Sequence, residues 1–187
     1  MSCGENTASK IALETNEGIV GLKSLIEKEF GLDKKAHTLS ISMKGRTSSD
    51  IDQITIFFTE NNKDGMWFYS MSTAQLLKPE PTDSTEPEVK MKALSEFTIE
   101  AIPSYYDQAI AMIEKETNEF TNFRINSYDL NIEKNPNTIT HRFTLLADKT
   151  DNKTSYYGTR LEGNVFSFKF ATDENGTLKC SKGLDAF

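Results

Sequence analysis

The sequence has few of the residues that usually carry protein chemistry. Its 187 residues include two cysteines, two histidines and one tryptophan. Because Cys3 and Cys180 lie near opposite ends of the chain, they cannot form the closely spaced ligand set of a zinc site or a disulfide framework. His37 and His141 have no cysteine or strained serine motif beside them in the sequence. We therefore predict no metal, no cofactor and no catalytic residue.

The chain also lacks the charge pattern of a nucleic-acid-binding protein and the apolar length of a membrane span. Its 21 basic residues stand against 28 acidic ones, which gives a net charge of −7. Phosphate backbones bind clustered Lys and Arg side chains, and no such cluster is present. No apolar run approaches the ~18 residues that a spanning helix needs. Any membrane attachment must therefore be covalent.

A covalent attachment point is suggested by Ser2-Cys3-Gly4 and the polar residues that follow, up to Lys10. The pattern resembles the mature start of Bacteroidota-type lipoproteins, in which the cysteine takes the lipid and a polar segment tethers the folded body. The resemblance implies lipidation of Cys3 and a place in the bacterial cell envelope, on its periplasmic or surface side. A disulfide between Cys3 and Cys180 stays an alternative.

The first half of the chain predicts one helix followed by three strands. Apolar residues recur at steps of three and four between Glu17 and Phe30, with Asn16 as N-cap and Gly31 as the helix stop. Three segments with alternating apolar residues follow, around 39–43, 54–58 and 66–69. Period-two alternation is typical of antiparallel strands with one buried face.

Residues 78–90 contain three of the five prolines and four acids but no aromatic residue. This composition predicts a linker or an exposed loop. Within it, Asp83-Ser84-Thr85 resembles the acceptor tripeptide for O-glycosylation in Bacteroidota envelope proteins, which implies Ser84 as a modification site.

The second half repeats the plan of the first. A helical stripe begins near Ile102 with Pro103 in its first turn, and strands are expected near 125–133, 138–147, 154–161 and 164–171. A shift of 89 residues carries Leu39 onto Tyr128, and the same shift carries Trp67-Phe68 onto Tyr156-Tyr157.

The prediction is an α+β fold of two tandem units, each with one helix followed by a three- to four-stranded antiparallel meander. The expected boundaries are a flexible tether at 1–14, a first unit at 15–77, a linker at 78–95 and a second unit at 96–187. In outline this resembles tandem cystatin-like or PepSY-like modules, and that likeness carries no site residues.

Aromatic residues on both faces of the third expected strands are the main candidates for binding. We interpret Trp67, Tyr69, Tyr156 and Tyr157 either as core or as an exposed platform for a peptide, glycan or partner protein. The sequence thus favours a non-enzymatic, lipid-anchored protein that binds or assembles with another envelope component.

Two alternatives stay open at this point. One is a carrier that holds a small apolar ligand or lipid between helix and sheet. The other is a hydrolase that uses Asp129 and His141, which are predicted on neighbouring strands. Oligomeric state is not indicated by the sequence.

Overall fold

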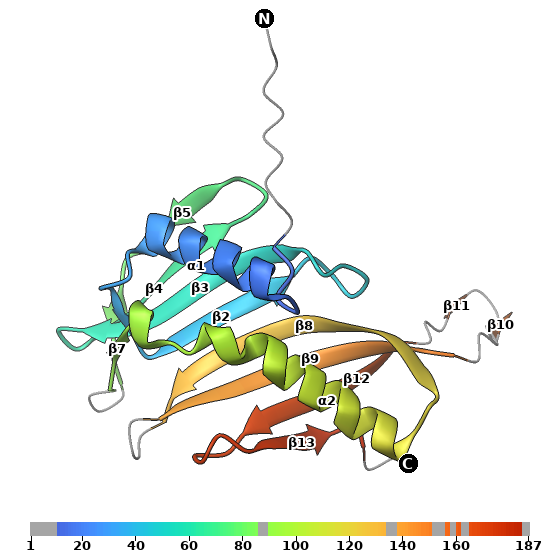
Figure 1. The fold of residues 1–187 in the computed structure, drawn as a ribbon. Coiled ribbons are helices and arrows are strands. Elements are labelled where there is room, and N and C mark those ends of the chain that lie inside the picture. Colours follow the sequence, from blue (N-terminus) through green and yellow to red (C-terminus); the bar gives the residue numbers. More distant parts are fainter. Residues whose placement is uncertain are drawn as a thin grey trace, which may run out of the picture.

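The computed structural model describes residues 11–85, 90–133, 138–150, 156–157, 160–161 and 165–184. In these residues the chain forms two α-helices, two short 3-10 helices and a large antiparallel sheet, shown in Figure 1. The predicted α+β class is confirmed. No helix in the described ranges is both long and apolar enough to cross a membrane.

Helix α1 runs from Asn16 to Phe30, as the apolar stripe predicts. The predicted N-cap is wrong by one residue, because the Thr15 hydroxyl accepts a hydrogen bond from the Gly18 backbone N–H at 3.0 Å. Gly31 ends the helix with φ 82°, a conformation that glycine adopts without strain. Leu13 is 1% exposed and lies in the core, so the predicted tether at 1–14 extends too far.

Helix α2 runs from Ile102 to Glu116, with Pro103 in its first turn as predicted. Two 3-10 turns, η1 (Leu94–Glu96) and η2 (Ile99–Ala101), lead into it. Its buried side chains are Ile102, Ala109 and Ile113, which form a stripe along one side of the helix.

The main sheet has nine strands, all paired antiparallel. The strand order is β13-β12-β9-β8-β2-β3-β4-β5, and β6 also pairs with β4. The bounds are β2 Thr38–Met43, β3 Ile51–Glu60, β4 Lys63–Ser70, β5 Gln75–Leu77, β6 Thr82–Asp83, β8 Phe120–Ile132, β9 Ile139–Lys149, β12 Val165–Thr172 and β13 Leu178–Lys182.

The two halves of the chain meet where β2 pairs with β8. Leu39 lies opposite Leu130 and Ile41 opposite Tyr128, and all four side chains are buried. Both helices lie against this same face of the sheet (Figure 1), and their buried residues join those of the strands in one hydrophobic cluster. The result is two layers, helices on sheet, with neither helix on the other face.

Much of the predicted linker at 78–95 is held against the first half. Strands β5 and β6 pair with the two ends of β4, and Pro79 and Pro81 lie between them. Proline has no N–H to offer an incoming strand, so this segment protects the edge of β4 from further pairing. Strand β7 (Lys92–Ala93) then pairs with β1 (Lys35–Ala36) in a separate two-stranded sheet.

The predicted role of Tyr156-Tyr157 in a third strand of the second half is wrong. These residues form β10, which pairs with β11 (Arg160–Leu161) in a two-stranded sheet separate from the main one. The strand that lies beside β9 is β12, whose Phe170 is opposite Phe143. The position along the chain suggested that residues 156–157 would pair with β9, whereas the more apolar β12 pairs with it.

Candidate functional site

The helix-free face of the main sheet is the candidate site, because strand alternation points polar side chains to it. Leu39, Ile41 and Met43 of β2 are buried toward the helices, while the hydroxyls between them, Ser40 and Ser42, are only half-buried. Side chains in a strand alternate between the two faces, and this alternation holds across neighbouring strands. The helix-free face therefore collects the polar half of each strand.

Strand register arranges these side chains into a continuous line, which we name the polar row. Each member lies opposite the next on the neighbouring strand, from β12 across to β5. At a strand spacing of ~4.8 Å the row extends over roughly 29 Å. Its members in order are Lys169, Thr144, Ser127, Ser42, Gln53, Ser70 and Gln75.

A second row runs beside the polar row and is polar over only part of its length. Arg142, Asp129, Ser40 and Thr55 follow one another across β9, β8, β2 and β3. The Ser40 hydroxyl donates to Asp129 Oδ1 at 2.5 Å. The Gln53 amide nitrogen donates to Thr55 Oγ1 at 2.8 Å and so connects the two rows.

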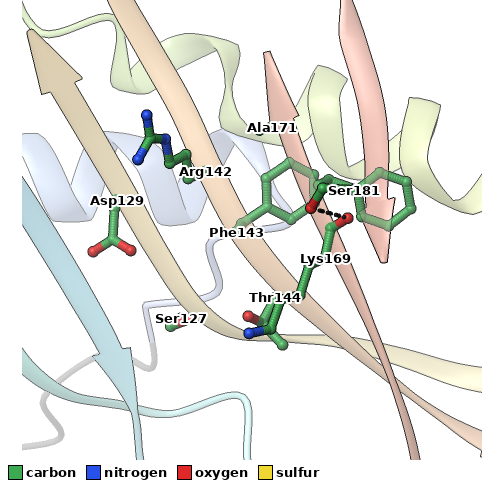
Figure 2. A pocket seen from close by; sticks show the side chains of 9 residues that line it. Ser127, Asp129, Arg142, Phe143, Thr144, Lys169, Ala171 and Ser181 are labelled. Carbon is green, nitrogen blue, oxygen red and sulfur yellow. Dashed lines mark hydrogen bonds between the residues drawn. The ribbon is translucent and has the colours of Figure 1, made fainter. Parts of the chain in front are cut away.

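The face is hollowed where β8, β9 and β12 meet, with a volume of about 220 Å³. Figure 2 shows this hollow and the residues that line it, which are Ser127, Asp129, Arg142, Phe143, Thr144, Lys169, Phe170, Ala171 and Ser181. Two cations and one carboxylate are among them. A second carboxylate, that of Glu133, pairs with Arg142, so Lys169 is the cation of the hollow that has no ion pair among the described residues.

Several polar side chains in the hollow have hydrogen-bonding capacity that no described side chain satisfies. The Arg142 guanidinium donates to Glu133 Oε1 at 3.0 Å through Nη2. Within the described residues, the Ser127 and Thr144 hydroxyls make no side-chain hydrogen bond and Lys169 makes no ion pair. Hydroxyl and ammonium groups without protein partners that line a hollow are free to bind water or a ligand.

Two exposed apolar side chains lie at the opposite end of the helix-free face, beside the polar row. Met66 is 39% exposed and Leu77 is 44% exposed. A second hollow of about 350 Å³ lies here between β4 and the proline-containing segment, lined by Phe57, Asp64, Gly65, Met66, Pro79, Glu80 and Thr82. At the β4–β5 edge the face therefore carries apolar side chains beside Ser70 and Gln75 of the polar row.

The predicted aromatic platform is on the other face of the sheet. Tyr69 is 6% exposed and belongs to the core, so its ring is not available to a partner. Trp67 is half-buried, with Lys34 Nζ 4.3 Å and Lys78 Nζ 4.0 Å from the centroid of its ring. Both lysines occupy the ring by cation–π contact. The side chains of Tyr156 and Tyr157 lie outside the described residues.

The two predicted modification sites differ in what the structure describes. The backbone N–H of Ser84 donates to the Asn62 carbonyl oxygen at 2.8 Å, which holds this serine beside the β3–β4 turn. The turn itself is made by Asn61 and Asn62 with φ 53° and 56°, values typical of a tight hairpin. Cys3 lies outside the described residues.

Asp129 and His141 point to opposite faces of the sheet, so they form no proton-transfer pair. Asp129 lines the hollow, whereas His141 is 2% exposed on the helix side. Its Nδ1 lies 2.9 Å from the Tyr128 hydroxyl and its Nε2 lies 3.0 Å from Thr98 Oγ1. Burial lowers the pKa of His141 to about 4, so the ring is neutral at pH 7. It ties the sheet to the segment before α2.

Sequence reasoning missed the polar row, although Ser42, Ser127, Thr144 and Lys169 lie at the polar positions of predicted alternating strands. Among the described residues no group of three His, Cys, Asp or Glu side chains is placed to hold a metal ion. No protein-family model, curated protein or solved structure matches the chain. The site must therefore be interpreted from its own geometry.

Proposed function

We propose that this chain is a non-enzymatic, lipid-anchored protein of the bacterial envelope that binds another envelope component on the helix-free face of its sheet. The observation that carries the proposal is the polar row, together with the hollow around Lys169 at its β12 end. Hydroxyl, amide and ammonium groups there have free hydrogen-bonding capacity. The row places one polar side chain on each of seven consecutive strands.

The anchor is a separate part of the proposal and rests on Ser2-Cys3-Gly4. A lipid on Cys3 followed by a short polar tether would hold the folded body close to the membrane surface. Intact-mass measurement of the native protein from a bacterial membrane fraction tests this part. The expected result is an acylated Cys3, and an unmodified cysteine on a chain that partitions away from membranes contradicts it.

We further propose that the two halves are copies of one helix–meander unit. A shift of 89 residues carries Leu39 onto Tyr128 and Ile41 onto Leu130. In the sheet, Leu39 lies opposite Leu130 and Ile41 lies opposite Tyr128. This is the pairing expected if a two-fold axis between Ser40 and Asp129 relates the two copies. Each half then adds two further strands outward, β3 and β4 in one and β9 and β12 in the other.

Binding on the helix-free face is tested by photo-crosslinking. A photoreactive phenylalanine analogue replaces Ser181 at the rim of the hollow, and in a matched control it replaces Glu114 on the exposed side of α2. After incubation with envelope material from the source cells, we expect adducts from position 181 and none above background from position 114. Equal yields from the two positions, or none from either, contradict the proposed face.

A carrier of a small apolar ligand is the second candidate, and one hollow favours it. This hollow has a volume of about 300 Å³, lies beside α1, and is lined by Lys23, Ile26, Glu27, Leu32, Leu94, Ser95 and Ile99. Its volume is at the lower end of the range for ligand pockets. Native mass spectrometry after gentle purification discriminates, because a carrier retains a ligand mass and the protein that we propose does not.

A further inference from the structure

We infer that the component bound on the helix-free face is an extended acidic polysaccharide, which lies across the strands along the polar row with a carboxylate at Lys169 and Arg142. This inference rests on the proposed function and adds the chemical class of the ligand. Three features of the described residues support it: the spacing of the row, the state of the backbone beneath it, and the charge at one end.

The spacing of the polar row suits a chain of sugar rings. The row offers one Ser, Thr, Gln or Lys side chain on each strand, at intervals of ~4.8 Å. A pyranose unit in an extended polysaccharide has a similar length and carries hydroxyl groups at each step. Hydroxyl and amide side chains both donate and accept hydrogen bonds, so they can pair with sugar hydroxyls in either direction.

The backbone under the row argues against an extended peptide as the ligand. Peptides that bind sheets usually add a strand at an edge, where unpaired N–H and C=O groups are available. The polar row crosses the interior strands β9, β8, β2 and β3, whose backbones already pair on both sides. A protein surface is also disfavoured, because stable protein interfaces centre on buried aromatic and apolar residues that the row lacks.

The ammonium group of Lys169 at the β12 end favours an acidic ligand. Lys169 makes no ion pair within the described residues, and Arg142 uses one nitrogen of its guanidinium for Glu133. The polar row contains no Asp or Glu, although acidic residues outnumber basic ones in the whole chain. Asp129 at the edge of the hollow accepts from Ser40 and retains a second oxygen for a ligand hydroxyl. A carboxylated sugar matches this arrangement of donors and one acceptor.

The test is calorimetric titration of the full chain with two uronate oligosaccharides, oligogalacturonate and oligoalginate, each compared with its own methyl ester. Esterification removes the charge of the carboxylate and keeps the rest of the sugar. We expect at least one free acid to bind about fivefold to tenfold more tightly than its ester, as an accessible charge-assisted contact predicts. The difference should shrink as salt is raised.

Three variants locate the interaction. Lys169→Gln should remove the preference for the free acid, whereas Lys115→Gln, the same change on the exposed surface of α2, should keep it. Thr144→Val is nearly isosteric and should weaken binding of acid and ester alike by about threefold to tenfold, since it removes one hydrogen bond. Thermal melting checks that each variant is folded.

Three outcomes overturn the inference and differ in what they say of the proposed function. If acid and ester bind equally and Lys169→Gln has no effect, the acidic class is wrong while the binding face stands. If no saccharide binds and position 181 crosslinks a protein, the ligand is a protein on the same face. If no saccharide binds and position 181 gives no adduct, the proposed function fails as well.

Discussion

His141 should make this protein less stable in acid. The ring is 2% exposed and its pKa is lowered to about 4 by burial, against ~6.5 for histidine in an unfolded chain. At pH values between these two pKa values, His141 is protonated in the unfolded chain and neutral in the folded protein. The stability that neutral His141 contributes is therefore complete above about pH 6.5 and is lost as the pH falls toward 4.

The magnitude follows from the two pKa values. Each unit of difference corresponds to ~1.4 kcal/mol, so the wild-type protein should lose about 3 kcal/mol of unfolding free energy between pH 7 and pH 4 from this residue alone. Other groups also respond to acid, because hydrogen bonds from Arg124 and from Lys179 hold the pKa values of Asp148 and Asp173 below the usual range. A variant that lacks only His141 separates these contributions.

The assay is urea unfolding of wild type and His141→Gln at pH 7, 6, 5 and 4, followed by circular dichroism. Glutamine cannot titrate and retains one polar contact, so the variant should be less stable than wild type at pH 7 and the gap should close by about 3 kcal/mol at pH 4. Two curves that run parallel over the whole range would refute the account of a buried neutral ring.

Other substitutions test the helix cap, the lysine beside Trp67 and the junction of the two halves. Thr15→Ala should cost about 1 kcal/mol of unfolding free energy in urea titrations, because it removes the cap of α1, and Thr15→Ser should restore it. Lys34→Met should lower the free energy of unfolding by about 1 kcal/mol, since Lys34 Nζ lies over two aromatic rings and pairs with Glu60. Lys35→Met, at an exposed neighbouring position, should have little effect. Leu130→Ala at the β2–β8 junction should lower the free energy of unfolding by roughly 2 to 5 kcal/mol, as the loss of other buried leucines does. In calorimetry both halves of this variant should still unfold in one transition. Two separate transitions would contradict a shared core.

The local elements were predictable from sequence because their signals are local. The three- and four-residue apolar steps located α1, and the alternation of Leu39, Ile41 and Met43 located β2 together with its buried face. Gly31 and Pro103 marked a helix end and a helix start for reasons that belong to single residues. Period-two alternation also identified the polar half of the strands that it predicted.

Pairing between distant strands was not predictable in the same way. The third strand of the second half was expected at Tyr156-Tyr157 because its distance along the chain matched the first half, whereas the sheet uses β12. Trp67 and Tyr69 appeared as a platform because a strand has two faces and the sequence does not say which one the helices cover. The structure places both on the covered face.

The polar row depends on register, which no single segment encodes. Ser42 and Ser127 become neighbours only because β2 pairs with β8 across the middle of the chain. The same register separates Asp129 from His141, which appeared close in the order of strands. The site therefore emerges from long-range pairing that local patterns do not determine.

The claim that the helix-free face is occupied in the envelope can be measured by lysine labelling. Intact envelopes and the purified chain are treated with the same amine-reactive reagent, and the labelled peptides are quantified by mass spectrometry. The account predicts that Lys169 is protected in the envelope relative to the purified chain, whereas Lys115 on the outer side of α2 is labelled equally in both. Two results would contradict the account: equal labelling of Lys169 in the two samples, or protection of Lys115 in the envelope to the same degree as Lys169.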